Sequence, residues 1–291
     1  MFSGSYTALV TPFKNNKVDF DAFEKLIELQ IAGGITGIIP CGTTGESATL
    51  SHEEHDKVIE MAVKFAKKRI KVIAGTGSNS TAEAIRLSKH AEEVGCDAVL
   101  LVSPYYNKPT QQGLYLHFKA IANSLKIPVI LYNIQGRTAV NIEPATVKRL
   151  NDDCKNIVAI KEASGSLDQM SQIRLLCPDL CMLCGDDSLT LPLMAIGGKG
   201  VISVLSNIVP KDVSGLVNAM LNEDFNKARE LHFKLFHLVK MMFIETNPIP
   251  VKTAMGMMGL CSDELRLPMC EMQKANREKL ADALKAYGLI K

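Results

Sequence analysis

The chain has 291 residues, of which 47% are hydrophobic and 22% are charged, and this balance excludes an intrinsically disordered protein. The formal net charge of +2 excludes the strongly basic surface that is typical of nucleic-acid-binding proteins. No apolar run reaches the roughly 18 residues of a membrane span, and no secretory leader begins the chain, so we expect a soluble cytoplasmic protein. Its 8 cysteines are then expected to be reduced and mostly buried.

Short apolar segments alternate with longer helical segments through residue 224. The expected strands are apolar along nearly their whole length, as in parallel sheets that are covered on both faces. They span Tyr6–Val10, Gly37–Cys41, Lys71–Ala74, Ala98–Val102, Pro128–Tyr132, Ile157–Lys161, Cys181–Cys184 and Gly200–Val204.

The helical segments carry local start and stop signals. Asp19 is placed to cap a helix that Gly33-Gly34 ends. The segments Ser51–Glu54 and Ser80–Glu83 both have the spacing of a capping box, in which the glutamate reaches back to the backbone of the serine. Pro144 occupies a first-turn position, where proline is tolerated. Each signal predicts a helix between two expected strands.

This alternation predicts a (β/α)8 TIM barrel over residues 1–224. The main alternative, an open doubly wound sheet, normally has a glycine-rich phosphate turn after its first strand, whereas Thr11-Pro12-Phe13 follows here. From residue 225 to residue 291 the strand pattern stops. We expect helices at Phe225–Phe243, Val251–Leu260 and Cys270–Tyr287, forming a C-terminal segment that packs on the barrel.

Polar residues follow the expected strands at the ends where TIM barrels place their active sites. Lys161 closes the apolar strand Ile157–Ile160, so its ammonium is drawn toward a dry interior. Desolvation lowers the pKa of a lysine, and the neutral amine can attack a carbonyl carbon to form a Schiff base. The alternative is a lysine whose apolar stem is buried while its ammonium reaches water.

Two further features can each be interpreted as either structural or functional. Thr43-Thr44 lies between two glycines, so it is either a tight turn or a site where hydroxyl and backbone N–H groups approach a carboxylate. Arg137 is either a surface residue or a bidentate clamp for a carboxylate. No strand end carries a histidine, cysteine and aspartate trio suited to a metal such as zinc.

Taken together, these motifs resemble those of the pyruvate-dependent class I aldolases, and within them the dihydrodipicolinate synthases. The resemblance covers essentially the whole chain, including two motifs in the tail. It is carried by the ordered segments Gly42–Glu46, Tyr105-Tyr106, Tyr132-Asn133, Ile160–Glu162, Asn247–Lys252 and Leu265–Pro268.

The resemblance implies a lyase that condenses pyruvate with aspartate-4-semialdehyde in the diaminopimelate and lysine pathway, without a dissociable cofactor or a metal. It implies that Lys161 forms the Schiff base. Tyr132 would transfer protons through Thr43 to Tyr106, which would come from a neighbouring subunit of a homotetramer built as a dimer of dimers. The remaining implied substrate contacts are Thr44 and the backbone at Ile202 for pyruvate, and Arg137, Gly185 and Asp186 for the aldehyde.

Relatives of this kind usually have a proline two residues before the arginine, whereas Gln135-Gly136 precede Arg137 here. The loop is therefore expected to be more flexible. The resemblance also implies feedback inhibition by lysine at a dimer interface. The matching positions are Ser47, Ala48, His52, His55, Asn79, Glu83 and Tyr105, although Glu83 also fits a helix cap and the histidines fit the first turn of a helix.

Three alternatives remain. The spacing of Cys177, Cys181 and Cys184 is found in radical enzymes with an iron–sulfur cluster, but two of these cysteines fall on one strand at an odd separation and should face opposite ways. N-acetylneuraminate lyases and keto-deoxy sugar-acid aldolases share the lysine, the tyrosine and the threonine turn. A barrel without catalysis would be expected to lack this set, which is intact.

Overall fold

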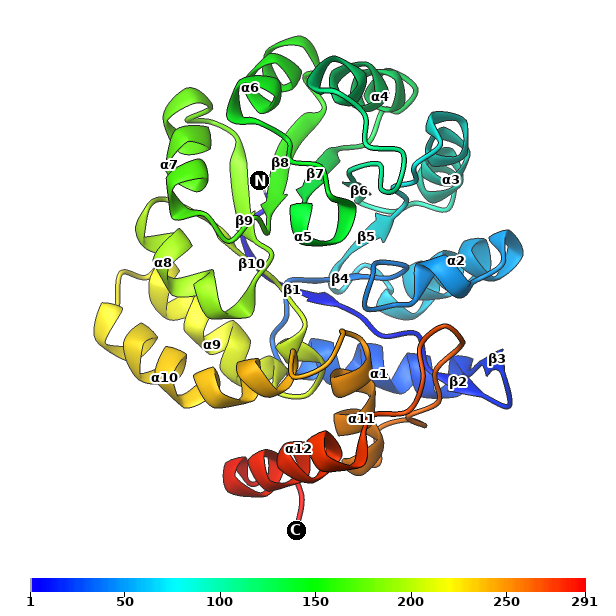
Figure 1. Ribbon diagram of the computed structural model, residues 1–291, viewed down its shortest axis with the longest axis vertical. Helices are drawn as coiled ribbons and strands as arrows, with labels where there is room; N and C mark the ends of the chain where they lie inside the picture. The colour runs from blue at the N-terminus through cyan, green and yellow to red at the C-terminus, as the bar shows by residue number, and fades with distance from the viewer. Residues whose placement is uncertain (1) are drawn as a thin grey trace.

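The computed structural model describes residues 2–291, in which eight parallel strands close into a barrel (Figure 1). Closure follows from β1, which pairs with both β4 and β10, so the open-sheet alternative is excluded and the predicted TIM barrel is confirmed. The strands are β1 (Gly4–Ala8), β4 (Gly37–Ile39), β5 (Lys71–Gly75), β6 (Ala98–Val102), β7 (Val129–Asn133), β8 (Ile157–Glu162), β9 (Cys181–Cys184) and β10 (Gly200–Ser203).

An outer ring of helices covers the strands (Figure 1). Because parallel strands are joined by crossovers, each helix returns the chain to the same end of the barrel. The helices of the ring are α1 (Phe20–Ala32), α2 (His52–Ala66), α3 (Thr81–Glu93), α4 (Gln111–Asn123), α6 (Pro144–Asp153), α7 (Leu167–Leu176), α8 (Thr190–Ala195) and α9 (Pro210–Leu221).

The core has two layers. Alternate residues of the strands fill the barrel interior, among them Tyr6, Ile39, Ile130 and Leu183. The other residues of the strands pack against the apolar faces of the helices. Cys181 belongs to the first layer and Cys184 to the second, so the two thiols face opposite sides of β9, as predicted.

Most of the predicted helix signals are confirmed. Asp19 accepts from the backbone of Ala22, and Gly33 ends α1. Ser51 and Glu54 form a complete capping box. The box expected at Ser80 is only half formed. Ser80 accepts from the Glu83 N–H, but the Glu83 carboxylate is bound elsewhere.

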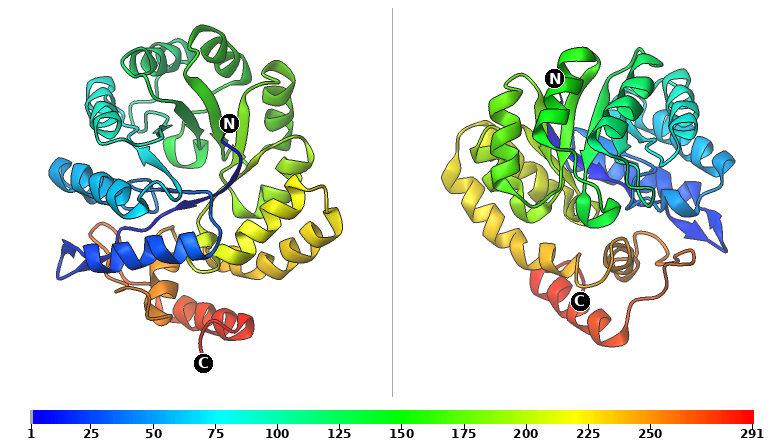
Figure 2. Two further views of the ribbon diagram at one scale, coloured as in Figure 1. Left: turned by 180° about the vertical axis from the view of Figure 1, so that it is seen from behind. Right: turned by 45° about the horizontal axis from the view of Figure 1, so that its top comes forward.

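The C-terminal segment consists of α10 (Phe225–Met241), α11 (Ile249–Met257) and α12 (Lys274–Tyr287), gathered on one side of the barrel (Figure 2). Helix α10 packs on α9, and α12 contacts both α10 and α11. The sequence did not predict a small hairpin of β2 (Phe13–Lys14) and β3 (Lys17–Val18), or the single turn α5 (Gln135–Thr138). No helix within residues 2–291 is long and apolar enough to cross a membrane.

Candidate active site

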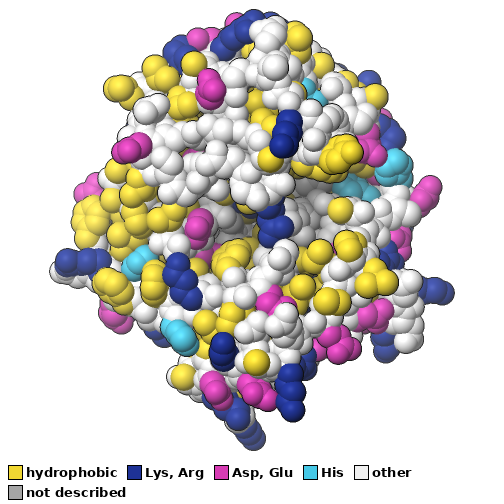
Figure 3. Space-filling model, in the orientation of Figure 1, with side chains coloured by type: hydrophobic (Ala, Val, Ile, Leu, Met, Phe, Trp, Pro, Cys, Tyr) yellow, Lys and Arg dark blue, Asp and Glu magenta, His cyan; other side chains and the backbone are white. Residues whose placement is uncertain are grey.

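A cavity opens at the carboxyl ends of the strands, where Figure 3 shows a hollow near the middle of the face. Its inner part has a volume of about 90 Å³ and is lined by residues that include Thr43, Thr44, Tyr132, Lys161 and Gly185. An outer part of about 270 Å³ shares Thr43 with it and reaches out to Tyr105. A small inner chamber thus leads into a larger outer one.

Lys161 lies at the inner end of this cavity. It is in register with Tyr132 on the neighbouring strand, and its Nζ lies 4.1 Å from the centre of the Tyr132 ring. Burial lowers the pKa of Lys161 from 10.5 to about 8, while the Asp187 carboxylate raises this pKa and Arg137 lowers it further. A useful fraction of the amine is therefore neutral near physiological pH, as nucleophilic attack requires.

Tyr132 presents its phenol beside the amine. Burial raises the pKa of Tyr132 to about 12, whereas the charge of Arg137 and a hydrogen bond with Thr43 act in the opposite direction. The hydroxyl thus remains protonated at neutral pH and can donate a hydrogen bond or a proton to a neighbouring atom.

The turn between β4 and α2 places Thr43 and Thr44 at the cavity. The backbone N–H of Glu46 donates to the Thr43 carbonyl over 3.1 Å, and Glu46 has a left-handed φ of +53°. Thr44 is buried, and its hydroxyl accepts a hydrogen bond of 3.0 Å from Asn247 Nδ2. Asn247 also lines both parts of the cavity, although no pattern in the sequence marked it as a site residue.

Arg137 lies on the exposed turn α5 and lines both parts of the cavity. One guanidinium nitrogen donates to the Asn247 carbonyl over 3.1 Å, which anchors the side chain despite the exposed Gln135-Gly136 that precede it. The guanidinium is therefore available to an anion in the outer part, because only this one hydrogen bond engages it within the described chain.

Three of the predicted catalytic and substrate-binding residues do not line the cavity of this chain. Asp186 accepts from the backbone and hydroxyl of Ser188, and thereby caps a short 3-10 turn. The Ile202 side chain is buried in the barrel interior, in register with Tyr6. Tyr106 is 90% exposed and has a φ of +74°, so its side chain faces solvent rather than Thr43.

Asp187 is a buried carboxylate whose charge acts on Lys161. Its Oδ2 accepts from the backbone N–H groups of Val204, over 2.9 Å, and Leu205, over 3.1 Å. Burial raises the pKa of Asp187, and these hydrogen bonds oppose the increase. Nothing in the sequence marked Asp187 as a neighbour of Lys161.

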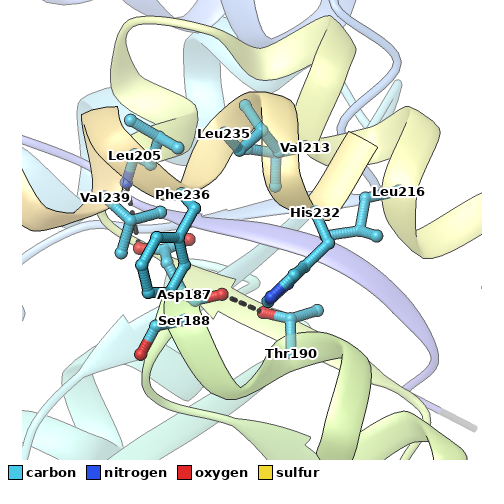
Figure 4. Close-up of a pocket in the computed structure, with 10 residues that line it drawn as sticks. All are labelled: Asp187, Ser188, Thr190, Leu205, Val213, Leu216, His232, Leu235, Phe236 and Val239. Atoms are coloured by element: carbon cyan, nitrogen blue, oxygen red, sulfur yellow. Dashed lines mark hydrogen bonds between the residues drawn. The ribbon is translucent and has the colours of Figure 1, made fainter. Parts of the chain in front are cut away.

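A separate small cavity lies on the far side of Asp187, where Figure 4 shows His232 of α10 pointing toward Thr190. Its volume is about 10 Å³, which is room for about one water molecule. Burial lowers the pKa of His232, so this histidine is neutral at physiological pH. This cavity is therefore too small for a substrate.

The family assignment follows from comparisons with known proteins. A model of the dihydrodipicolinate synthetase family matches residues 1–287. The chain belongs to this family. It is 64% identical over 291 residues to the 4-hydroxy-tetrahydrodipicolinate synthase of Endomicrobium trichonymphae, with 100% of both chains covered. The crystal structure of dihydrodipicolinate synthase from Aquifex aeolicus is 55% identical, with a TM-score of 0.98 over 99% of each chain. The predicted resemblance is thus confirmed.

Two solved synthases of the family have a bound small molecule. The structure of the enzyme from Acinetobacter baumannii, 46% identical over the full length of both chains with a TM-score of 0.97, is complexed with pyruvate. That of the enzyme from Cyanidioschyzon merolae, 40% identical over 99% of both chains with a TM-score of 0.96, has lysine bound. A monomeric synthase variant, 42% identical with a TM-score of 0.97 over 99% of this chain and 98% of the variant, is also known.

The residues expected to bind lysine form a cluster beside the outer part of the cavity. Nε2 of His52 lies 2.8 Å from Oε1 of Glu83, and Ser78 donates to the second oxygen of Glu83. Asn79 Nδ2 donates to the Tyr105 carbonyl over 3.2 Å. These hydrogen bonds with Ser78 and His52 lower the pKa of Glu83, which keeps the carboxylate charged.

The other expected members of this cluster divide into two groups. Ser47 and Ala48 line the outer part of the cavity together with Tyr105. His55 instead turns inward, where its Nε2 lies 3.0 Å from the Gly75 carbonyl, and burial lowers its pKa. His55 therefore joins α2 to Gly75, which lines the inner part of the cavity.

Within residues 2–291, no three histidine, cysteine, aspartate or glutamate side chains lie close enough together to hold a metal ion. The cysteines suggested for an iron–sulfur cluster are separated. Cys181 donates to the Phe2 carbonyl in the barrel interior, and Cys184 donates to the Asp186 carbonyl on the outer side of β9. The structure thus contradicts a shared cluster at these positions.

Proposed function

We propose that the protein condenses pyruvate with aspartate-4-semialdehyde to give 4-hydroxy-tetrahydrodipicolinate and water, a lyase reaction of the diaminopimelate and lysine pathway. The observation that carries the proposal is the buried Lys161 amine, with a lowered pKa, beside the Tyr132 phenol in a chamber sized for a small acid. Relatives at 55–64% identity that are named 4-hydroxy-tetrahydrodipicolinate synthase favour this substrate pair over sugar acids.

The reaction begins when neutral Lys161 Nζ attacks C2 of pyruvate. Loss of water gives a protonated imine, which withdraws electrons so that a methyl proton can leave and an enamine forms. The enamine carbon then bonds to the aldehyde carbon of the second substrate, whose oxygen takes up a proton. The amino group of this substrate finally attacks the imine carbon, which closes the ring and releases Lys161.

Tyr132 and Thr43 transfer protons in this scheme. The protonated phenol of Tyr132 donates to the departing oxygen of C2, and the resulting phenolate can take a proton from the next reaction step. The hydrogen bond with Thr43 supports the charged form of the phenol, because Thr43 lowers its pKa. No histidine lines the cavity among the described residues, so these hydroxyls are the candidates for this role.

The carboxylates of the two substrates bind to different residues. Thr44 and the backbone near Ile202 hold the pyruvate carboxylate, close to Lys161. Arg137 holds the carboxylate of the aldehyde substrate in the outer part of the cavity. Gly185 lines the inner part, where this substrate meets the enamine, and Asp186 follows Gly185 in the chain without lining the cavity. The residues that support this division are Thr44, whose hydroxyl is anchored by Asn247, and Arg137, whose exposed guanidinium is reachable from solvent.

The catalytic unit is the barrel, residues 1–224, with residues 225–291 packed on it. The active assembly is a homotetramer built as a dimer of dimers, in which Tyr106 of one chain completes the site of its neighbour. The exposed Tyr106 at a positive φ supports this proposal, because a strained backbone conformation persists only where surrounding contacts hold it, and those of the Tyr106 side chain would come from a neighbouring chain. A cytoplasmic location accompanies this biosynthetic role.

Lysine, the product of the pathway, inhibits the protein by binding beside the outer part of the cavity. Its ammonium would pair with Glu83, and Asn79 and Tyr105 would offer hydrogen bonds to the rest of the molecule. His52 occupies one Glu83 oxygen in the structure, so lysine would compete with His52 for this carboxylate. The shared residue Ser47 joins the effector cluster to the catalytic cavity.

Borohydride reduction in the presence of pyruvate tests the Schiff base directly. We expect peptide mass mapping to find one reduced pyruvate adduct, on Lys161, and none in Lys161→Ala. A coupled assay with the reductase that consumes the product then tests the second substrate. Labelling of another residue would refute the role of Lys161, and turnover with sugar acids alone would refute the substrate pair.

A further inference from the structure

A buried ion pair joins the C-terminal segment to the turn that carries Thr43 and Thr44. Nζ of Lys252, in α11, lies 2.6 Å from Oε1 of Glu46, and their side chains are 0% and 1% exposed. Lys252 also donates to the Thr11 carbonyl over 2.9 Å. Such a pair contributes little stability compared with apolar residues of the same volume, because both charges lose their hydration. Its presence therefore needs another explanation.

The Glu46 carboxylate is fully engaged by the C-terminal segment. Its second oxygen accepts from the backbone N–H of Arg266 over 3.1 Å. The ammonium of Lys252 and the guanidinium of Arg266 both contact the ring of Phe13, at 4.2 Å and 4.3 Å from its centre. The carboxylate is thus held by two parts of the tail, and the cations of both parts contact the ring of Phe13.

Fixing Glu46 fixes the turn before it. The N–H of Glu46 donates to the Thr43 carbonyl, and the N–H of Ser47 donates to the Gly42 carbonyl over 3.3 Å. Since Glu46 has a left-handed backbone conformation, this arrangement is strained and depends on its tertiary contacts. Release of the carboxylate would let the turn relax and would move the two threonines.

A second contact acts at the same place. Asn247 precedes α11 and donates to the Thr44 hydroxyl, so the tail holds the turn both at its side chain and through Glu46. Neither contact could be inferred from the sequence, because 203 residues separate Asn247 from Thr44 and 206 separate Lys252 from Glu46.

We propose that Lys252 is a positioning residue for catalysis, which acts through Glu46 to hold Thr43 and Thr44 in place beside Lys161. The inference rests on the proposed function, because it assigns Thr43 to proton transfer and Thr44 to the pyruvate carboxylate. The C-terminal segment is then part of the catalytic apparatus, although none of its charged side chains touches a reacting atom.

Steady-state kinetics of Lys252→Met with pyruvate as the varied substrate test this proposal. We expect KM for pyruvate to rise about tenfold, because Thr44 loses its position, and kcat to fall by at least the same factor, because Thr43 does too. A change in KM is decisive, since a variant that merely folds less well would contain less active protein but would leave KM unchanged.

The matched control is Leu280→Ala, which removes a fully buried side chain from α12 without touching the turn. Both variants should lower the melting temperature, but only Lys252→Met should raise KM. If Lys252→Met does not fold, Glu46→Gln serves instead. Its single carbonyl oxygen cannot serve both Lys252 and Arg266 as the carboxylate does, so a smaller rise in KM is expected.

Borohydride trapping on the wild-type protein distinguishes a failure of the positioning role of Lys252 from a failure of the proposed function. If wild type forms the Lys161 adduct but KM for pyruvate stays within twofold of wild type in Lys252→Met, or in Glu46→Gln where Lys252→Met does not fold, the positioning role is refuted while the proposed function stands. If wild type forms no adduct at Lys161, the proposed function is refuted, and the positioning role with it.

Discussion

Gly185 lies directly against the side chain of Lys161. A Cβ atom at position 185 would lie 3.0 Å from Lys161 Cε and 2.6 Å from the Ala163 Cβ. The missing side chain therefore leaves space in which the amine can change its position as it passes from free base to imine. Glycine at this position is explained by close approach rather than by an unusual φ, because Gly185 is not among the glycines with positive φ.

Gly185→Ala should therefore slow the formation of the pyruvate adduct by roughly tenfold or more, because the added methyl group displaces Lys161 from its attacking position. The rate of borohydride trapping measures this effect. Gly136→Ala is the matched control, since a Cβ at position 136 would have no neighbour within 4 Å. Equal trapping rates in the two variants would contradict the role of this contact.

The pH dependence of adduct formation should follow the Lys161 amine. Only the neutral form attacks, so the rate should rise with pH and level off above about 8, the lowered pKa of Lys161. In Asp187→Asn the charge that favours the ammonium is lost, so this pKa falls further. The rising limb should then move to lower pH, by about one unit.

The rate of borohydride trapping, measured at a series of pH values, gives the profiles of the wild-type protein and of Asp187→Asn. Asp179→Asn, which removes an exposed charge, should keep the wild-type profile. A profile of Asp187→Asn that is unchanged, or displaced to higher pH, would show that the Asp187 charge does not act on the amine.

Sequence patterns predicted the barrel because each strand had to be apolar on both faces, and this constraint repeats along the chain. They also placed Lys161 at the carboxyl end of a buried strand, where TIM barrels have their active sites, but only the structure shows that its side chain is buried rather than reaching water. Strand ends differed by up to two residues, as at β1, where pairing with β10 begins at Gly4 rather than at Tyr6.

Other features depend on contacts that no local pattern contains. Each strand of the β2–β3 hairpin is only two residues long, and the hairpin relies on left-handed backbone conformations at Asn15 and Asn16. Asn247 reaches Thr44 only because the tail returns across the mouth of the barrel. The capping box predicted at Ser80 is incomplete because the Glu83 carboxylate forms hydrogen bonds with Ser78 and His52 instead.

Tyr132→Phe should keep the fold and form the Lys161 adduct more slowly, and its turnover should fall by about 10² to 10⁴, as expected when a positioned proton donor is removed. The coupled assay measures turnover, and borohydride trapping measures the adduct. Tyr6→Phe is a suitable control, because Tyr6 is also a buried barrel tyrosine, but its hydroxyl donates to the Ser3 carbonyl rather than lining the cavity. Normal turnover by Tyr132→Phe would exclude Tyr132 from proton transfer.

Mixing two inactive variants tests whether Tyr106 crosses between subunits. Tyr106→Ala and Lys161→Ala should each be nearly inactive alone. After the subunits are dissociated and reassociated, half of the dimers should be hybrids, each with one intact site, so about one quarter of wild-type activity should return. Activity that stays at the level of the separate variants would show that each chain uses its own Tyr106.

The regulatory proposal depends on the Glu83 carboxylate, which stays charged because hydrogen bonds with Ser78 and His52 lower its pKa. Calorimetric titration of the wild-type protein with lysine should detect binding at millimolar concentration or below. Glu83→Gln should weaken it at least about tenfold, since an amide cannot form a charge-assisted pair with the ammonium. Glu60→Gln, on the neighbouring α2 and paired with Lys57, should bind lysine like wild type. If titration of the wild-type protein with lysine gives no heat of binding, the proposal of lysine regulation is refuted. If Glu83→Gln and Glu60→Gln bind lysine equally well, Glu83 is not part of the effector site.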